Sequence, residues 1–190
     1  FQEEMQERNL KLAGIYWYGN KLFLAERHDD IVKEATLAAA FLHRCGCDIL
    51  NVDTMQRSFV KTGDEIGKES VDEDILASIA ECLNRVGKAT LEHGVKTVVH
   101  QHLNAVIENR REIDIFMKYA DPELVWLCPD PAQLVLSGVD PADLIRSYPE
   151  RIGYMHLKDA ADGWKMSPRE WIHGAEWPIM ETADDLFIWE

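Results

Sequence analysis

Residues 95–102, VKTVVHQH, indicate the fold most clearly: a short apolar run that ends in three polar side chains. An amphipathic pattern over residues 70–93 precedes it and is closed by Gly94, and a second such pattern comes after it over residues 109–119. A glycine directly after an amphipathic pattern is typical of a helix C-terminus. The stretch is therefore predicted to be a strand between two helices, the repeating unit of parallel α/β proteins.

The same alternation runs through most of the chain. Other apolar runs predict strands at residues 10–18, 48–53, 124–130 and 151–158, and other amphipathic runs predict helices at residues 31–44 and 142–148. Short, wholly apolar strands are expected where helices cover a parallel sheet or where a barrel closes. No Gly-x-Gly-x-x-Gly or Walker loop follows any of these strands, which excludes the commonest nucleotide-binding folds.

We expect one α/β domain over residues 1–190, with an irregular tryptophan-rich loop at about residues 160–186. Such a loop is a lid or a subunit contact, or else an irregular segment packed on the core. A complete (β/α)8 barrel needs about 250 residues. If the fold is a barrel, we therefore expect the first and last strands to be missing from this chain. The open sheet edges could then pair with a second copy of the chain.

The charge of the chain narrows its partners. Its formal net charge is −14, which disfavours nucleic acid and anionic membranes. No apolar run approaches the length of about 20 residues that a membrane span needs, and the start does not resemble a signal peptide. The four cysteines lack the Cys-x-x-Cys spacing of zinc and redox sites. These features predict a cytoplasmic protein.

Ligand-type residues stand at the ends of three successive predicted strands. The first of these strands ends in His100-Gln101-His102, the next in Asp130, and the last in His156 with Lys158 and Asp159 just beyond. The carboxyl ends of parallel strands meet at one edge, where α/β proteins place their chemistry. Taken singly, each histidine is better explained as a core residue and Asp130 as a turn former. Together they predict a site for Mn²⁺, Co²⁺, Mg²⁺ or Zn²⁺ with mixed nitrogen and oxygen ligands.

Three stretches resemble the sugar phosphate isomerase/epimerase family, whose fold is the xylose isomerase-like TIM barrel. They read GVKTVVHQH, then IENRREIDIFMKYADPELVWLCPD, then SGVDPADLIRSYPERIGYMHLKD, and the likeness is greatest to the branch that contains inosose dehydratase. Members typically show His-x-His and Asp-Thr-Gly-His strand ends, a Gly-x-Asp-Pro helix start and an Arg-Ile-x-x-x-His-x-Lys-Asp strand. The resemblance implies a (β/α)8 barrel that holds a divalent metal and acts on a sugar or a related polyol.

The resemblance also implies roles for individual residues. It gives Asp130 and His156 as metal ligands, with His100 or His102 at the third position, and we assign the metal to His100. Glu108 and His102 are the candidates for moving a proton, although Glu108 could also be a helix-start charge. Lys158 and Asp159 either contact substrate oxygens or orient His156, and we also assign Gln133 to substrate contact. Gln133 departs from the family pattern, because relatives place a histidine there that can carry a proton or bind metal.

Four functions remain open at this point. The leading one is a metal-dependent sugar isomerase or epimerase that transfers a proton next to a carbonyl group, and the second is dehydration of a keto-inositol. A barrel that binds a ligand without chemistry is the third, motivated by Gln133 and by the missing final strand. A DNA-repair endonuclease shares the barrel, but the negative charge argues against it.

Overall fold

The computed structural model describes residues 1–19, 21–54, 71–103, 105–160 and 187–188. Its centre is a parallel sheet of four strands in the order β1 (Ile15–Tyr18), β2 (Ile49–Asp53), β3 (Lys96–His100) and β4 (Val125–Cys128). Because neighbours in the sheet are also neighbours in the sequence, the strands form an arc of the kind from which a (β/α) barrel is built.

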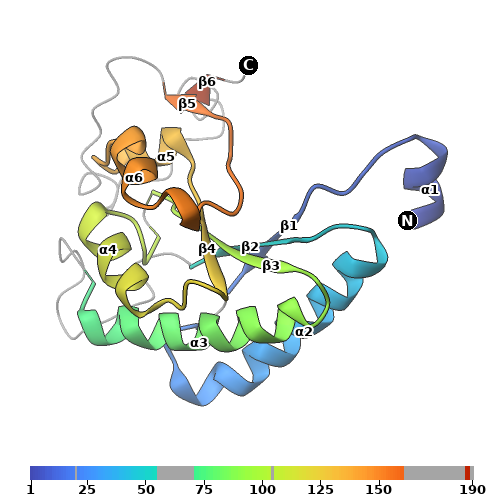
Figure 1. Cartoon of the computed structure of the whole chain (residues 1–190), viewed down its shortest axis with the longest axis horizontal. Helices are drawn as coiled ribbons and strands as arrows, with labels where there is room; N and C mark the ends of the chain where they lie inside the picture. Colours follow the sequence, from blue (N-terminus) through green and yellow to red (C-terminus); the bar gives the residue numbers. More distant parts are fainter. Residues whose placement is uncertain (20, 55–70, 104, 161–186, 189–190) are drawn as a thin grey trace, which may run out of the picture.

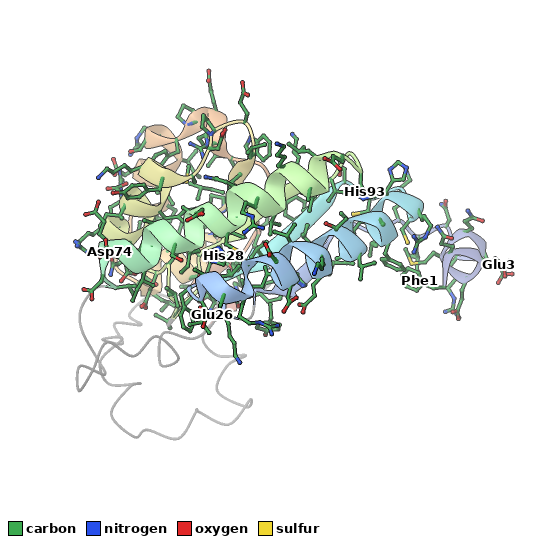
Figure 2. The ribbon with its side chains drawn as sticks, turned by 90° about the horizontal axis from the view of Figure 1, so that it is seen from below. Phe1, Glu3, Glu26, His28, Asp74 and His93 are labelled. Carbon is green, nitrogen blue, oxygen red and sulfur yellow. The ribbon has the colours of Figure 1, made fainter. Side chains whose placement is uncertain are left out.

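Helices alternate with the strands and cover one face of the arc (Figure 1). The long ones are α2 (His28–Arg44), α3 (Glu73–Leu91) and α4 (Arg110–Tyr119), and α2 and α3 lie side by side (Figure 2). The shorter elements are α1 (Gln2–Glu7), η1 (Ala25–Arg27), α5 (Pro131–Leu136), α6 (Pro141–Ser147), η3 (Pro149–Arg151) and the antiparallel pair β5 (Asp159–Ala160) and β6 (Phe187–Ile188). Within the described ranges, no helix is both long enough and apolar enough to cross a membrane.

The two faces of the sheet carry different side chains, because successive residues of a strand point to opposite sides. On the helix-covered face, Leu50, Val52 and Val99 belong to the main hydrophobic core. On the other face, Ile49 and Val98 join Cys128 in a small apolar cluster that supports the polar groups at the carboxyl ends of the strands. The inner face is therefore apolar at its base and polar at its mouth.

Helix starts that hold the loops near this mouth are capped by side chains. The Asn109 side chain accepts the Glu112 amide, and the Glu112 carboxylate accepts the Asn109 amide, which forms a capping box for α4. Asp130 caps α5 by accepting the amide of Gln133 at 3.1 Å. Asp140 caps α6 by accepting the amide of Asp143 at 3.0 Å, with a proline at the first helical position.

Most predicted elements are confirmed, with some changes of length. The strand predicted at residues 10–18 is regular only over Ile15–Tyr18. The strand predicted at residues 95–102 ends at His100, so His102 lies in the loop beyond it. Helix α5 was not predicted, because Asp130 between two prolines indicates a turn although it also makes a good helix cap. The tryptophan-rich loop lies outside the described residues.

The strand predicted at residues 151–158 was wrong as a regular strand. This segment runs beside β4 but makes only an isolated parallel bridge between Leu127 and Ile152. The Gly153 amide donates to the Leu127 carbonyl at 2.9 Å and the His156 amide to the Pro129 carbonyl at 3.0 Å. Within the described residues, its hydrogen bonds to β4 and Pro129 do not continue into a regular ladder. The segment still reaches the mouth of the arc.

Candidate active and metal site

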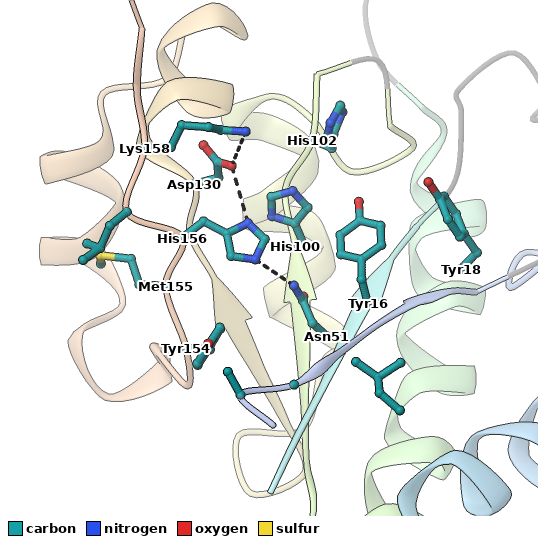
Figure 3. A pocket seen from close by; sticks show the side chains of 14 residues that line it. Tyr16, Tyr18, Asn51, His100, His102, Asp130, Tyr154, Met155, His156 and Lys158 are labelled. Atoms are coloured by element: carbon teal, nitrogen blue, oxygen red, sulfur yellow. Dashed lines mark hydrogen bonds and ion pairs between the residues drawn. The ribbon is translucent and has the colours of Figure 1, made fainter. Parts of the chain in front are cut away.

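A cavity of about 760 Å³ opens on the inner face of the arc, at the carboxyl ends of its strands (Figure 3). Side chains from β1, β2, β3, the end of β4 and the segment 154–158 line it. Its charged and imidazole groups are His100, His102, Asp130, His156 and Lys158. The strand ends that carry ligand-type residues in the sequence therefore share one cavity.

Asp130 is the anionic centre of this cavity. Its side chain is fully buried, and its Oδ2 lies 3.0 Å from Lys158 Nζ and 3.5 Å from His156 Nδ1. Its Oδ1 accepts the Gln133 amide. Burial on its own would raise the pKa of Asp130, but the hydrogen bonds from His156 and Gln133 and the charge of Lys158 outweigh it and lower that pKa below its usual value. The carboxylate is therefore ionised at neutral pH.

His100 is a neutral imidazole with one nitrogen to offer. Burial, and then the nearby imidazoles of His156 and His102, lower the pKa of His100 to about 3. Its Nδ1 lies 3.4 Å from the carbonyl oxygen of Cys128. A carbonyl oxygen can only accept a hydrogen bond, so Nδ1 carries the ring proton in this contact and Nε2 keeps its lone pair. A neutral imidazole with a free lone pair is a metal ligand and not an acid.

His102 lies beyond β3 with its ring half-buried at the cavity wall. Its Nδ1 donates to the carbonyl oxygen of Leu103 at 2.7 Å. The same reasoning places the lone pair of the neutral ring on Nε2. The His100 and His102 ring centroids are 5.5 Å apart, so the two imidazoles lie next to each other.

The donor atoms of three side chains gather tightly enough to bind one ion. Among the described residues, His100, Cys128 and His156 form a group whose ligand atoms all lie within 4.8 Å of one another. Burial raises the pKa of Cys128 to about 12, so its thiol is protonated and is the weakest of these ligands. Asp130 is not a member of this group, but its Oδ2 lies 3.5 Å from His156 Nδ1 and could serve as an oxygen donor. A set of two imidazoles and one carboxylate fits a divalent cation of intermediate hardness.

The predicted site residues divide into two groups. Five of them line the cavity: His100, His102, Asp130, His156 and Lys158. The other three are not among its lining residues: Glu108, Gln133 and Asp159. Glu108 is buried in the loop before α4, where its amide donates to Glu112, and Asp159 is exposed in β5. Gln133 is buried behind the wall, and its Oε1 accepts the Leu103 amide at 3.0 Å, which anchors the loop that carries His102.

Several side chains that the fold brings to this cavity were not predicted from the sequence. Asn51 lies 3.0 Å from His156, through Nδ2 and Nε2, and three tyrosines, Tyr16, Tyr18 and Tyr154, line the walls. Tyr16 donates to Asp53 Oδ2 at 2.5 Å. Burial, and then this hydrogen bond, raise the pKa of Tyr16 far above its usual value, so the phenol stays protonated. The available signal was the polar pair Asn51 and Asp53 in an otherwise apolar strand.

Comparison with known proteins identifies the family to which this chain belongs. The profile of the xylose isomerase-like TIM barrel family matches residues 1–179, so the chain belongs to that family. Curated relatives include an inosose dehydratase of Clostridium botulinum, 30% identical over 161 residues, which are 83% of this chain and 53% of the relative. An inosose dehydratase of Clostridium perfringens is 34% identical over 161 residues, or 83% of this chain and 54% of the relative. The chain thus spans about half the length of these relatives.

Solved structures agree on the fold. A sugar phosphate isomerase/epimerase from Parabacteroides distasonis superimposes with a TM-score of 0.71 at 18% identity, over 87% of this chain and 59% of the other. A 3-keto-D-glucoside 4-epimerase from E. coli superimposes with a TM-score of 0.67 at 13% identity, over 83% of this chain and 62% of the other. The predicted fold class, part of a xylose isomerase-like (β/α) barrel, is confirmed.

Proposed function

We propose that the protein removes a proton from the carbon next to the carbonyl group of a sugar-like polyol, and that its reaction is the dehydration of a keto-inositol. The observation that carries this proposal is the convergence of His100, His102, Asp130, His156 and Lys158 on one cavity at the carboxyl ends of the strands. The curated relatives named inosose dehydratase favour dehydration over simple isomerisation as the reaction to test first.

The proposed cofactor is a divalent metal ion, Mn²⁺, Co²⁺, Mg²⁺ or Zn²⁺, with His100, Asp130 and His156 as its ligands. Neutral His100 and ionised Asp130 are in the protonation states that metal ligands need. A divalent cation held there would act as a Lewis acid toward a ketone oxygen and a neighbouring hydroxyl group. Lys158 holds a positive charge 3.0 Å from Asp130 and can also donate to a substrate oxygen from the cavity wall.

His102 is the proposed base, because the contact with Leu103 leaves its Nε2 lone pair available. In dehydration, His102 takes the proton from the carbon beside the ketone. The hydroxyl group on the next carbon then leaves as water with the proton that His102 took up, and the electron pair of the broken C–H bond forms the new carbon–carbon double bond. Glu108 remains a predicted proton carrier, although it does not line the cavity. Gln133 and Asp159 remain predicted substrate contacts on the same footing.

A sugar isomerase or epimerase is the second candidate, since it would use the same proton removal and differ only in the later steps. The base then returns the proton to a carbon and no water is lost. Incubation of the full-length, metal-loaded protein with an inosose and with several ketoses in D₂O separates the two. Deuterium incorporation with loss of water supports dehydration, and deuterium incorporation without it supports isomerisation or epimerisation. Neither outcome on any substrate would favour a barrel that binds without catalysis.

Variants test the role of His102. Substitution His102→Asn is expected to lower kcat by roughly 10²- to 10⁴-fold, the usual contribution of a positioned general base. His43 is exposed on α2, away from the cavity lining, so His43→Asn is the matched control and should leave kcat unchanged. Equal rates for the two variants would remove His102 from the proposed mechanism.

A further inference from the structure

Asn51 is a buried amide in the middle of β2, whose other residues are apolar except for Asp53 at its end. It is 4% exposed and shares its face of β2 with Ile49, a member of the inner apolar cluster. A buried side-chain amide is costly unless its polar atoms find partners. The partner of Asn51 therefore shows what the residue does.

The carboxamide of Asn51 is aimed at one ring nitrogen of His156 (Figure 3). Its Nδ2 lies 3.0 Å from His156 Nε2, while the opposite ring nitrogen, Nδ1, lies 3.5 Å from Asp130 Oδ2. The other amide atom, Asn51 Oδ1, is buried and has no hydrogen-bond partner among the described residues. The NH₂ group of Asn51 thus has a partner, and its carbonyl oxygen has none among the described residues.

The NH₂ group of Asn51 decides where the ring proton of His156 lies. An NH₂ group can only donate, so it requires a lone pair on Nε2 and leaves the single proton of the neutral ring on Nδ1, facing Asp130. A half turn of the carboxamide would bring Oδ1 to Nε2 instead. The proton would then lie on Nε2, and the Nδ1 lone pair would face the same side as the Asp130 carboxylate.

We propose that Asn51 is a positioning residue that selects the tautomer of His156 by the orientation of its amide. In the metal-free site the NH₂ group faces Nε2 and Nδ1 is a donor to Asp130. In the metal-loaded site the carbonyl oxygen faces Nε2, and Nδ1 and Asp130 present adjacent lone pairs to the ion. The second half of this statement rests on the proposed metal site, and the first half does not. Hydrogen bonds from a neighbouring group commonly fix the tautomer of a metal-binding histidine.

The tautomer can be read directly from ¹⁵N chemical shifts of the imidazole nitrogens. The full-length protein is labelled with ¹⁵N-histidine, and the His156 ring is assigned by its disappearance in His156→Gln. In metal-free protein we expect Nε2 to be unprotonated. The carboxylate introduced by Asn51→Asp is an acceptor at neutral pH, so this variant is expected to place a proton on Nε2 without any metal. Protonated Nε2 in the metal-free parent, or unprotonated Nε2 in Asn51→Asp, would overturn the proposal.

A titration with Zn²⁺ tests the loaded state. The parent is expected to move its ring proton to Nε2 as the ion binds, and Asn51→Leu, which offers no acceptor, should bind Zn²⁺ about 10- to 100-fold more weakly. Thr90→Val is the control, because it removes a buried hydrogen bond to Thr97 outside the cavity lining and should bind Zn²⁺ as the parent does. Parent-like affinity in Asn51→Leu would refute the role of Asn51. If the parent itself binds no Zn²⁺, the proposed metal site fails and the loaded half of this proposal fails with it. The metal-free spectra still decide the other half.

Discussion

The ion pair between Lys158 and Asp130 offers a sharp test of the site, because the chain contains an exposed pair of nearly equal length. The N–O distance is 3.0 Å in the buried pair, whose side chains are 13% and 0% exposed. It is 2.9 Å between Lys118 and Glu73, whose side chains are 62% and 44% exposed. Substituting each lysine by methionine removes the charge and keeps most of the apolar stem. The two variants therefore compare the loss of a buried ion pair with the loss of an exposed one at nearly the same N–O distance.

The expected losses of stability can be worked out from Coulomb's law. At 3.0 Å and an effective dielectric constant of about 20, the attraction in the buried pair is roughly 5–6 kcal/mol before desolvation is subtracted. Breaking a buried pair usually costs about 3–5 kcal/mol, because the remaining charge stays in a poor solvent. Asp130 keeps the Gln133 amide and the His156 ring as partners, so we expect Lys158→Met to lower the free energy of unfolding by about 2–4 kcal/mol. Lys118→Met should leave the free energy of unfolding nearly unchanged, since the pair is exposed to water and salt.

Urea denaturation of the parent and the two variants measures both values. The midpoint should fall for Lys158→Met with no change in slope, which would show a loss of stability without a change in the surface exposed on unfolding. A loss below about 0.5 kcal/mol for Lys158→Met, no larger than that of an ordinary surface substitution, would contradict the expected value. It would mean that Lys158 does not hold its ammonium group against the buried carboxylate.

Two further predictions concern the core and the cysteines. Gly87 lies inside α3, where alanine favours the helix by about 1 kcal/mol, but an added Cβ would press on the carbonyl group of Leu124 and lie 2.9 Å from its carbon. We therefore expect Gly87→Ala to lower the free energy of unfolding by roughly 1–3 kcal/mol in urea denaturation. A stabilised variant would contradict this contact. Burial raises the pKa values of Cys82 and Cys128 to about 12. A thiol reagent at pH 8 should therefore modify half-buried Cys45 first and leave Cys82 and Cys128 unmodified until the protein unfolds. Rapid reaction of Cys128 in the folded protein would show that solvent reaches the inner apolar cluster.

Those parts of the fold that depend on local pattern could be predicted from the sequence. The helices predicted at residues 109–119 and 142–148 depend on nearby residues, and both are confirmed. The parallel order of the strands results from the alternation of strands and helices. The segment at residues 151–158 was wrong as a strand because an apolar pattern does not show whether a segment forms a continuous hydrogen-bond ladder with its neighbour.

Which polar residues gather at one edge of the sheet could largely be predicted from the sequence. His100, His102, Asp130, His156 and Lys158 lie at or just beyond the ends of strand-like runs, and the rule for carboxyl ends suffices to bring them to one edge. Contacts between residues far apart in the sequence could not be predicted from the pattern of apolar and polar residues. Asn51 and His156 are 105 positions apart, and nothing in either stretch indicates that the other is its partner.

Gln133 shows a second limit of the sequence. Its type departs from the family pattern, and from the sequence we assigned it to substrate contact. In the structure its side chain points to the backbone of the loop that carries His102. A side chain that holds a loop and one that contacts substrate have the same polar character in the sequence. The structure shows the hydrogen bond to the loop, and the substrate contact stays a prediction.

The proposed function depends above all on one divalent ion, held by His100, Asp130 and His156 in the cavity at the carboxyl ends of the strands. Calorimetric titration of Mn²⁺ into the metal-free, full-length protein detects this ion without any substrate. We predict one ion per chain and an affinity that falls by at least about 10²-fold in both Asp130→Asn and His156→Gln, more than the loss of a supporting group costs. No binding in the parent, or parent-like affinity in both variants, would show that these side chains do not form a metal site.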